Sequence, residues 1–98
     1  MVIHKSVSGE EISIALEGRL DTTTAPELES LLKESLEGIT SLVFDLEKLE
    51  YISSAGLRVL LSAQKIMNRQ GAMKLIHVQE MIMEIFDVTG FTDVLTIE

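Results

Sequence analysis

The stretch Asp45-Leu-Glu-Lys-Leu-Glu-Tyr-Ile-Ser-Ser-Ala-Gly-Leu-Arg-Val-Leu-Leu61 joins a buried strand to a helix. The strand covers residues 41–46, and its consecutive apolar run Leu42-Val-Phe44 is typical of a strand in a parallel sheet that is covered by helices. The helix covers residues 55–70, and Gly71 stops it. A buried strand, a short polar loop and a helix in this order predict an α/β fold.

The two faces of this helix differ in character. Side chains three and four positions apart share one face of a helix. One face is apolar and is expected to pack on the sheet, through Leu57, Leu60, Leu61 and Met67. The opposite face carries a mostly basic stripe, formed by Arg58, Ser62, Lys65 and Arg69.

Two strands and another helix precede this stretch. Residues 2–7 form a predicted strand, and Ser8-Gly-Glu10 suits a hairpin turn into a second strand over residues 12–16, where apolar and polar positions alternate. Thr24-Ala-Pro-Glu27 predicts a helix start, with Thr24 as cap, Glu27 completing a capping box and Pro26 in the first turn. This helix is expected to run from Pro26 to about Glu37, with Leu31 and Leu32 inside.

The chain after Gly71 predicts a strand over residues 73–78, a helix marked by Ile82, Ile85 and Phe86 with Gly90 as its C-cap, and a short strand over residues 94–97. The full order is β-β-α-β-α-β-α-β. Strands that are joined through helices run parallel, and the opening hairpin adds an antiparallel pair. The prediction is therefore one α/β domain over residues 1–98, a mixed sheet covered by helices.

Composition excludes several classes of function. Sixteen acidic against eight basic residues give a formal net charge of −8, which disfavours direct binding to nucleic acid. The chain has no cysteine and only two histidines, His4 and His77, so we expect neither a metal site nor a cofactor. No apolar run approaches the length of a membrane span, and nothing reads as a signal peptide. The expected location is the cytoplasm.

Ser53 and Ser54 lie where the predicted helix begins. The N–H groups of a first helical turn stabilise an anion, including a phosphate carried by the serine itself. Serine at a helix start is also a common N-cap, so this local pattern leaves a structural cap and a regulatory phosphorylation site both open. Gly56, in the first turn, allows another backbone to come close.

The segment Tyr51-Ile-Ser-Ser-Ala-Gly-Leu57 resembles the signature loop of STAS domains, which typically reads Asp-Ser-Ser/Thr/Ala-Gly-Leu and leads into an apolar run. Gly18-Arg-Leu-Asp21 is similar to the family's second signature, Gly-x-Leu-Asp. The pair Asp45-Leu46 and the segment Ile85-Phe-Asp-Val-Thr-Gly-Phe91 match two more family patterns. The resemblance spans nearly the whole chain, in the family's order and spacing, and points to the anti-sigma factor antagonists.

The resemblance implies a bacterial transcription regulator that is not an enzyme. In this family the unphosphorylated antagonist binds an anti-sigma factor that is also an ATP-dependent serine kinase, and the sigma factor is released. The kinase phosphorylates the signature serine, which ends the binding, and a serine phosphatase removes the phosphate. By register with the signature, the phosphorylated residue is Ser54, with Ser53 as the fallback. The implied partner surface comprises Asp21, Ser53, Ser54, Gly56 and Arg58.

Two other interpretations remain. Ser53 stands where the signature usually has Asp, which favours a constitutive STAS subunit of a larger complex, such as a lipid-transport ATPase or a stress-signalling scaffold, without a phospho-switch. A hydrolase would use Ser54 with Asp45 and His77 at neighbouring strand ends. The loop lacks the Gly-x-Ser-x-Gly pattern of a nucleophile elbow, however, and so short a chain leaves little room for a substrate pocket.

Overall fold

The computed structural model describes all residues from Met1 to Glu98. It confirms the predicted α/β class, and every helix and the first four strands of the predicted order are present. In chain order the elements are β1 (Val2–Ser8), β2 (Glu11–Leu20), α1 (Ala25–Ser35), β3 (Ser41–Ile52), α2 (Ser54–Gln70), β4 (Ala72–Ile76), α3 (Glu80–Thr89) and the short 3-10 turn η1 (Phe91–Asp93).

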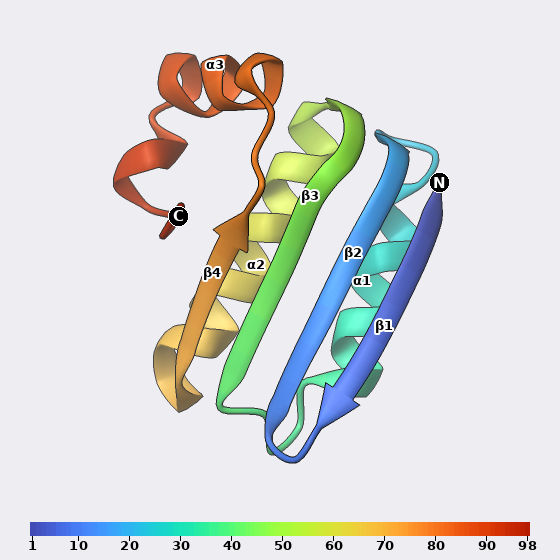
Figure 1. The fold of residues 1–98 in the computed structure, drawn as a ribbon, viewed down its shortest axis with the longest axis vertical. Helices are drawn as coiled ribbons and strands as arrows, with labels where there is room; N and C mark the ends of the chain where they lie inside the picture. The colour runs from blue at the N-terminus through green and yellow to red at the C-terminus, as the bar shows by residue number, and fades with distance from the viewer.

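The four strands form one mixed sheet in the order β1-β2-β3-β4. The β1–β2 hairpin is antiparallel, whereas β2–β3 and β3–β4 are parallel. Helices α1 and α2 pack side by side on one face of this sheet, and α3 lies beyond its upper end in the view of Figure 1. The carboxyl ends of β2, β3 and β4 therefore share one end of the sheet, which is where the loops into α1, α2 and α3 begin.

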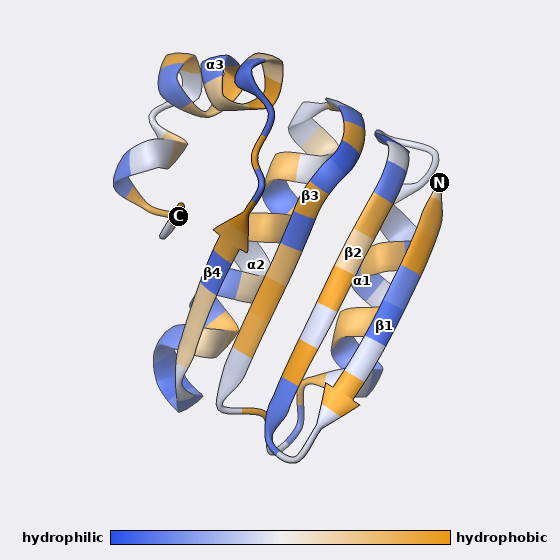
Figure 2. Ribbon diagram, in the orientation of Figure 1, coloured by the Kyte–Doolittle hydropathy of each residue, from blue (hydrophilic) through white to orange (hydrophobic).

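The core lies between the sheet and the two helices. Alternate positions of β2 and β3 are fully buried against the helices, which appears as banding along these strands in Figure 2. Of the helical leucines predicted to lie inside, Leu32, Leu57 and Leu60 are buried. Leu31 and Leu61 are only half-buried, and of the two only Leu31 packs against the core.

The sheet extends further than the sequence pattern indicates. We expected β3 to end near Leu46, but it continues to Ile52. Leu46, Leu49 and Ile52 are buried at a spacing of three, because the β2–β3 ladder contains register shifts between Ala15 and Glu17 and between Gly18 and Arg19. A bulge changes which face the next side chain occupies, so this part of the strand loses its period of two.

The C-terminal segment corrects a second expectation. The predicted strand over residues 94–97 reduces to one parallel bridge between Leu75 and Ile97. Gly90 is left-handed at φ 80° and ends α3 as predicted, but η1 then turns the chain so that it meets the edge of β4 only at its last residues. Strand β4 itself stops at Ile76, because His77 has a left-handed φ of 55°.

Candidate functional site

The loops that follow β2 and β3 lie side by side. Leu20 and Ile52 are partners in the parallel ladder, and the next residues of the two strands are Asp21 and Ser53. The N–H of Ser53 donates to the carbonyl oxygen of Leu20 at 2.9 Å. Asp21 and the Ser53–Ser54 pair, which are far apart in the sequence, therefore share one end of the sheet.

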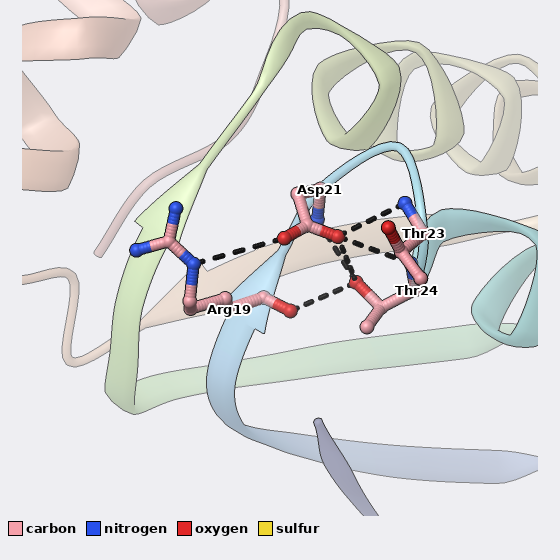
Figure 3. Close-up of polar contacts among 4 residues, drawn as sticks. All are labelled: Arg19, Asp21, Thr23 and Thr24. Atoms are coloured by element: carbon pink, nitrogen blue, oxygen red, sulfur yellow. Dashed lines mark hydrogen bonds and ion pairs between the residues drawn. The ribbon is translucent and has the colours of Figure 1, made fainter.

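Asp21 holds the loop before α1 in place through its carboxylate. Its Oδ1 accepts the backbone N–H groups of Thr23 at 3.0 Å and Thr24 at 3.2 Å (Figure 3). Its Oδ2 lies 3.7 Å from Nε of Arg19. The Thr24 N–H bond is the main cause that lowers the pKa of Asp21, with further contributions from Thr23, the Thr24 hydroxyl and Arg19. The arrangement thus favours an ionised carboxylate at this end of the sheet.

This geometry corrects the predicted capping box. The Thr24 side chain makes no cap hydrogen bond to α1. Its hydroxyl accepts the N–H of Asp21 at 2.9 Å and donates to the carbonyl oxygen of Arg19 at 2.8 Å. The backbone turns into a helical path one residue after Asp21, so that the Ala25 N–H already donates to the Asp21 carbonyl at 2.8 Å. Asp21, not Thr24, supplies the side-chain acceptor for the N–H groups of Thr23 and Thr24 that lead into α1.

Replacing Asp21 should remove a pH-dependent contribution to the stability of the protein. Because the pKa of Asp21 is lowered in the fold, its charge stabilises the folded state above the ordinary Asp pKa, and this contribution is lost as the pH falls through the lowered value. Asp21→Asn keeps an acceptor oxygen but has no charge to lose. Urea denaturation should show wild type more stable than Asp21→Asn at neutral pH, with the difference shrinking below about pH 4.

A difference between these two proteins that stays constant into acid would contradict this role for the charge. Asp21→Ala is the matched control, because it lacks the acceptor as well. It should be less stable than Asp21→Asn at every pH at which both proteins fold.

The two serines of the signature loop differ in accessibility. Ser53 is the N-cap residue of α2, with extended backbone at φ −100° and ψ 177°. Its Oγ is buried, has no hydrogen-bond partner and makes no cap bond to the helix. Ser54 is the first residue of α2 and is exposed. Of the two hydroxyl groups, that of Ser54 is the one a modifying enzyme could reach.

Gly56 is buried and faces inward. A Cβ at this position would lie 2.7 Å from Cγ of Leu20, 2.8 Å from Cγ1 of Ile52 and 3.0 Å from the Leu20 carbonyl oxygen. The glycine therefore lets the first turn of α2 approach the end of β2, as its predicted role requires. Any contribution of Gly56 to a binding surface is indirect, through the placement of Ser54 beside Asp21.

Arg58 is exposed one turn after Ser54 on α2. It lines a shallow groove of about 300 Å³ between α1 and α2, together with Thr22, Ala25, Pro26, Glu29, Ala55, Val59 and Ser62. This groove opens at the same end of the molecule as the loop that Asp21 organises.

One contact at this end was not foreseen. The guanidinium carbon of Arg19 lies 4.2 Å above the ring centre of Tyr51, in a cation–π contact between neighbouring strands. Arg19 and Tyr51 are ladder partners only because of the register shift between Gly18 and Arg19. No pattern in either strand alone reveals such a pair.

The structure does not bring Ser54, Asp45 and His77 together as a hydrolase site would require. Nδ1 of His77 and Oδ1 of Asp45 are 3.0 Å apart, but Asp45 lies within β3 and not at its end. Asp45 and Ile52 are seven positions apart along the strand, which places Ser54 roughly 20 Å from Asp45. Asp45, Glu47 and His77 do offer three possible metal ligands within 4.8 Å of one another, but Glu47 and His77 are exposed.

Comparison with known proteins identifies the family. Residues 2–98 match the model of the STAS domain. The chain belongs to the STAS domain family, as the signature segments predicted, and its relatives place it among the anti-sigma factor antagonists.

The chain is similar to BtrV of Bordetella bronchiseptica, a protein named as an anti-sigma factor antagonist, with 37% identity over 81% of this chain and 70% of that protein. It is 31% identical to the anti-sigma-B factor antagonist of Bacillus subtilis, over 89% of this chain and 81% of that protein. Both names describe regulatory proteins and not enzymes, as the sequence predicted.

Among solved structures, the fold resembles the Bacillus cell fate determinant SpoIIAA in the phosphorylated form. The TM-score is 0.78 at 17% identity, over 99% of this chain and 91% of that one. None of the helices in the present structure is long and apolar enough to cross a membrane.

Proposed function

We propose that this protein is an anti-sigma factor antagonist that works in the cytoplasm of a bacterium. In its unphosphorylated form it binds an anti-sigma factor that is also a serine kinase, and the sigma factor is released. Phosphorylation of Ser54 by that kinase ends the binding, and a serine phosphatase restores it. The relatives named as anti-sigma factor antagonists support this proposal.

The observation that carries the proposal is the position of Ser54. Ser54 is exposed at the first residue of α2, on the end of the sheet that also holds the Asp21 carboxylate. Ser53, the fallback acceptor, has a buried Oγ, which favours Ser54 as the acceptor. The similarity in fold to SpoIIAA, a protein solved in a phosphorylated form, is consistent with this assignment.

Phosphorylation at this place should change binding without unfolding the domain. A phosphoserine carries about −1.5 to −2 charges, and negative charge is favourable at a helix N-terminus. The added dianion can therefore be accommodated by the antagonist itself. It cannot be accommodated equally by a partner surface that has packed against a neutral serine, since desolvating an unpaired charge is costly.

The proposed partner surface centres on Asp21, Ser54 and Arg58, which are all accessible at or beside this end of the sheet. Gly56 and Ser53 take part only by shaping the loop. Gly56 packs closely against Leu20 and Ile52, and the Oγ of Ser53 is buried. The surface combines an ionised carboxylate, a hydroxyl group and a guanidinium group. Polar groups so arranged specify the partner and its orientation more than they add raw affinity.

Capture of the partner tests the proposal. The wild-type protein, immobilised and exposed to a lysate of the source bacterium, should retain a protein with a serine-kinase ATP site that otherwise binds a sigma factor. Adding ATP should phosphorylate the bait and release that protein. Retention of a different protein, unaffected by ATP, would contradict the proposal.

One observation favours a second candidate function. Ser53 replaces the aspartate of the family signature, and its buried hydroxyl group has no partner. If the missing carboxylate is needed for phosphorylation, the domain would be a constitutive subunit of a larger complex. In that case the captured complex would survive ATP, and the bait would carry no phosphate.

A further inference from the structure

Helix α2 differs in charge from the rest of the molecule. None of its 17 residues is Asp or Glu, although the chain has 16 acidic residues and a net charge of −8. Its three cations, Arg58, Lys65 and Arg69, are exposed and follow the three-and-four spacing of one helix face. We call these three side chains the α2 ridge.

The ridge cations have no acidic partners. None of the three takes part in an ion pair, whereas Arg19, Lys33 and Lys74 each pair with a nearby carboxylate. Lys48 helps to lower the pKa values of Glu17 and Asp45, and Lys5 donates to the hydroxyl group of Ser35. The ridge is thus a surface where three cations of one helix face lie without an ion-pair partner.

The surroundings of the ridge suit contact with another protein. Ile66, next to Lys65, is a large apolar side chain that is 37% exposed. The groove beside Arg58 contains one carboxylate, that of Glu29, and it is engaged by Lys33 at 3.2 Å. Nothing within the molecule therefore neutralises Arg58, and an acidic group brought by a partner would be its first counter-charge.

We propose that the α2 ridge binds an acidic surface of the protein that contacts Ser54, and that a phosphate on Ser54 weakens this binding by pairing with Arg58. The proposal rests on the function proposed above. Its first part follows from charge complementarity, because an acidic surface is attracted to the ridge and repelled by most of the remaining surface. Such a contact fixes the partner's orientation on α2.

The second part follows from helical spacing. Ser54 and Arg58 are four residues apart on one helix, so their side chains are neighbours on its surface. An acidic group at the N-terminal position of such a pair, with a cation four residues later, is the favourable orientation. A phosphate on Ser54 would therefore compete with the partner's carboxylates for the first cation of the ridge.

The docking part can be tested without the natural partner. The probe is a short Glu-rich helical peptide, with its Lys-rich counterpart as a control, titrated into the isotope-labelled protein at about 10 mM salt, where the Debye length is about 30 Å. The ridge variant is Arg58→Gln/Lys65→Gln/Arg69→Gln. The matched control, Lys5→Gln/Lys33→Gln/Lys74→Gln, has the same net charge and loses cations that lie elsewhere.

The Glu-rich peptide should shift amide resonances along α2 in wild type and in the matched control. In the ridge variant the affinity should fall about tenfold. Equal affinity for the two variants, shifts outside α2, or tighter binding of a DNA oligonucleotide than of the peptide would overturn the docking proposal. None of these results depends on the identity of the kinase. The proposed function would therefore stand even if the α2 ridge did not bind acidic surfaces.

The proposed pairing of the Ser54 phosphate with Arg58 can be measured separately. With phosphoserine incorporated at position 54, phosphorus NMR should give a lower second pKa for the phosphate in wild type than in Arg58→Gln, because the guanidinium stabilises the dianion. Lys65→Gln is the control and should leave that pKa at the wild-type value. An identical pKa in wild type and Arg58→Gln would show that the pair does not form.

Discussion

Ser54→Asp should weaken binding to the anti-sigma factor kinase by about 2–5 kcal/mol. The physical reason is that Ser54 lies at the centre of the proposed surface, so a fixed charge there must be desolvated against a partner surface that has packed against a neutral serine. The change should not harm the fold, because an acidic residue is favourable in the first turn of α2. Calorimetric titration of the purified kinase into each variant measures the loss directly.

Two control variants test whether the loss of kinase affinity arises from a charge at position 54. Ser54→Ala should bind nearly as well as wild type, since it removes the phosphate acceptor and adds no charge, and it should therefore act as a permanently active antagonist. Ser8→Asp adds the same charge at the opposite end of the sheet, at an exposed position of β1, and should not change the affinity. Equal losses in Ser54→Asp and Ser8→Asp would mean that net charge, and not this site, governs binding.

Leu60→Ala should lower the free energy of unfolding by about 2–5 kcal/mol. Leu60 is fully buried on the face of α2 that packs in the core. Its truncation removes the transfer energy of the side chain and leaves a cavity that the sheet and the neighbouring helix can fill only in part. Because a small domain is stable by only about 5–15 kcal/mol, this one change should be visible as a large drop in the denaturation midpoint.

Leu61→Ala is the matched control, because it makes the same truncation at the next position of the same helix. Leu61 is half-buried, so its loss should be clearly smaller. Both variants should keep the wild-type slope of free energy against urea concentration, since the transition still exposes the same surface. A Leu61→Ala variant as unstable as Leu60→Ala would mean that the packed face of α2 has been assigned wrongly.

The sequence predicted the helices well because their signals are local. The apolar spacing in α2, the Gly71 stop and the Gly90 C-cap are all set by residues within one or two turns, and the structure agrees with each of them within one residue. The parallel arrangement of β2 and β3 followed from the intervening helix. The family resemblance placed Asp21 and Ser54 in one implied partner surface, and the two residues do lie at the same end of the sheet.

What the sequence did not reveal depends on contacts between distant segments. The bulges that extend β3 to Ile52 exist only in the ladder with β2, and the Arg19–Tyr51 contact is a consequence of the same register shifts. The reduction of the last predicted strand to a single bridge depends on where η1 directs the chain. The carboxylate of Asp21, and not the hydroxyl of Thr24, supports the start of α1 because the loop begins its turn early.

The phosphorylation of Ser54 is tested most directly by incubating the protein with the purified anti-sigma factor kinase and ATP and measuring its intact mass and its phosphopeptides. We expect one added phosphate on wild type, located at Ser54, and none on Ser54→Ala. A phosphate on Ser53 would move the site by one residue and leave the mechanism in place. Absence of phosphate from wild type, together with kinase binding that is unchanged by Ser54→Asp, would contradict the switch.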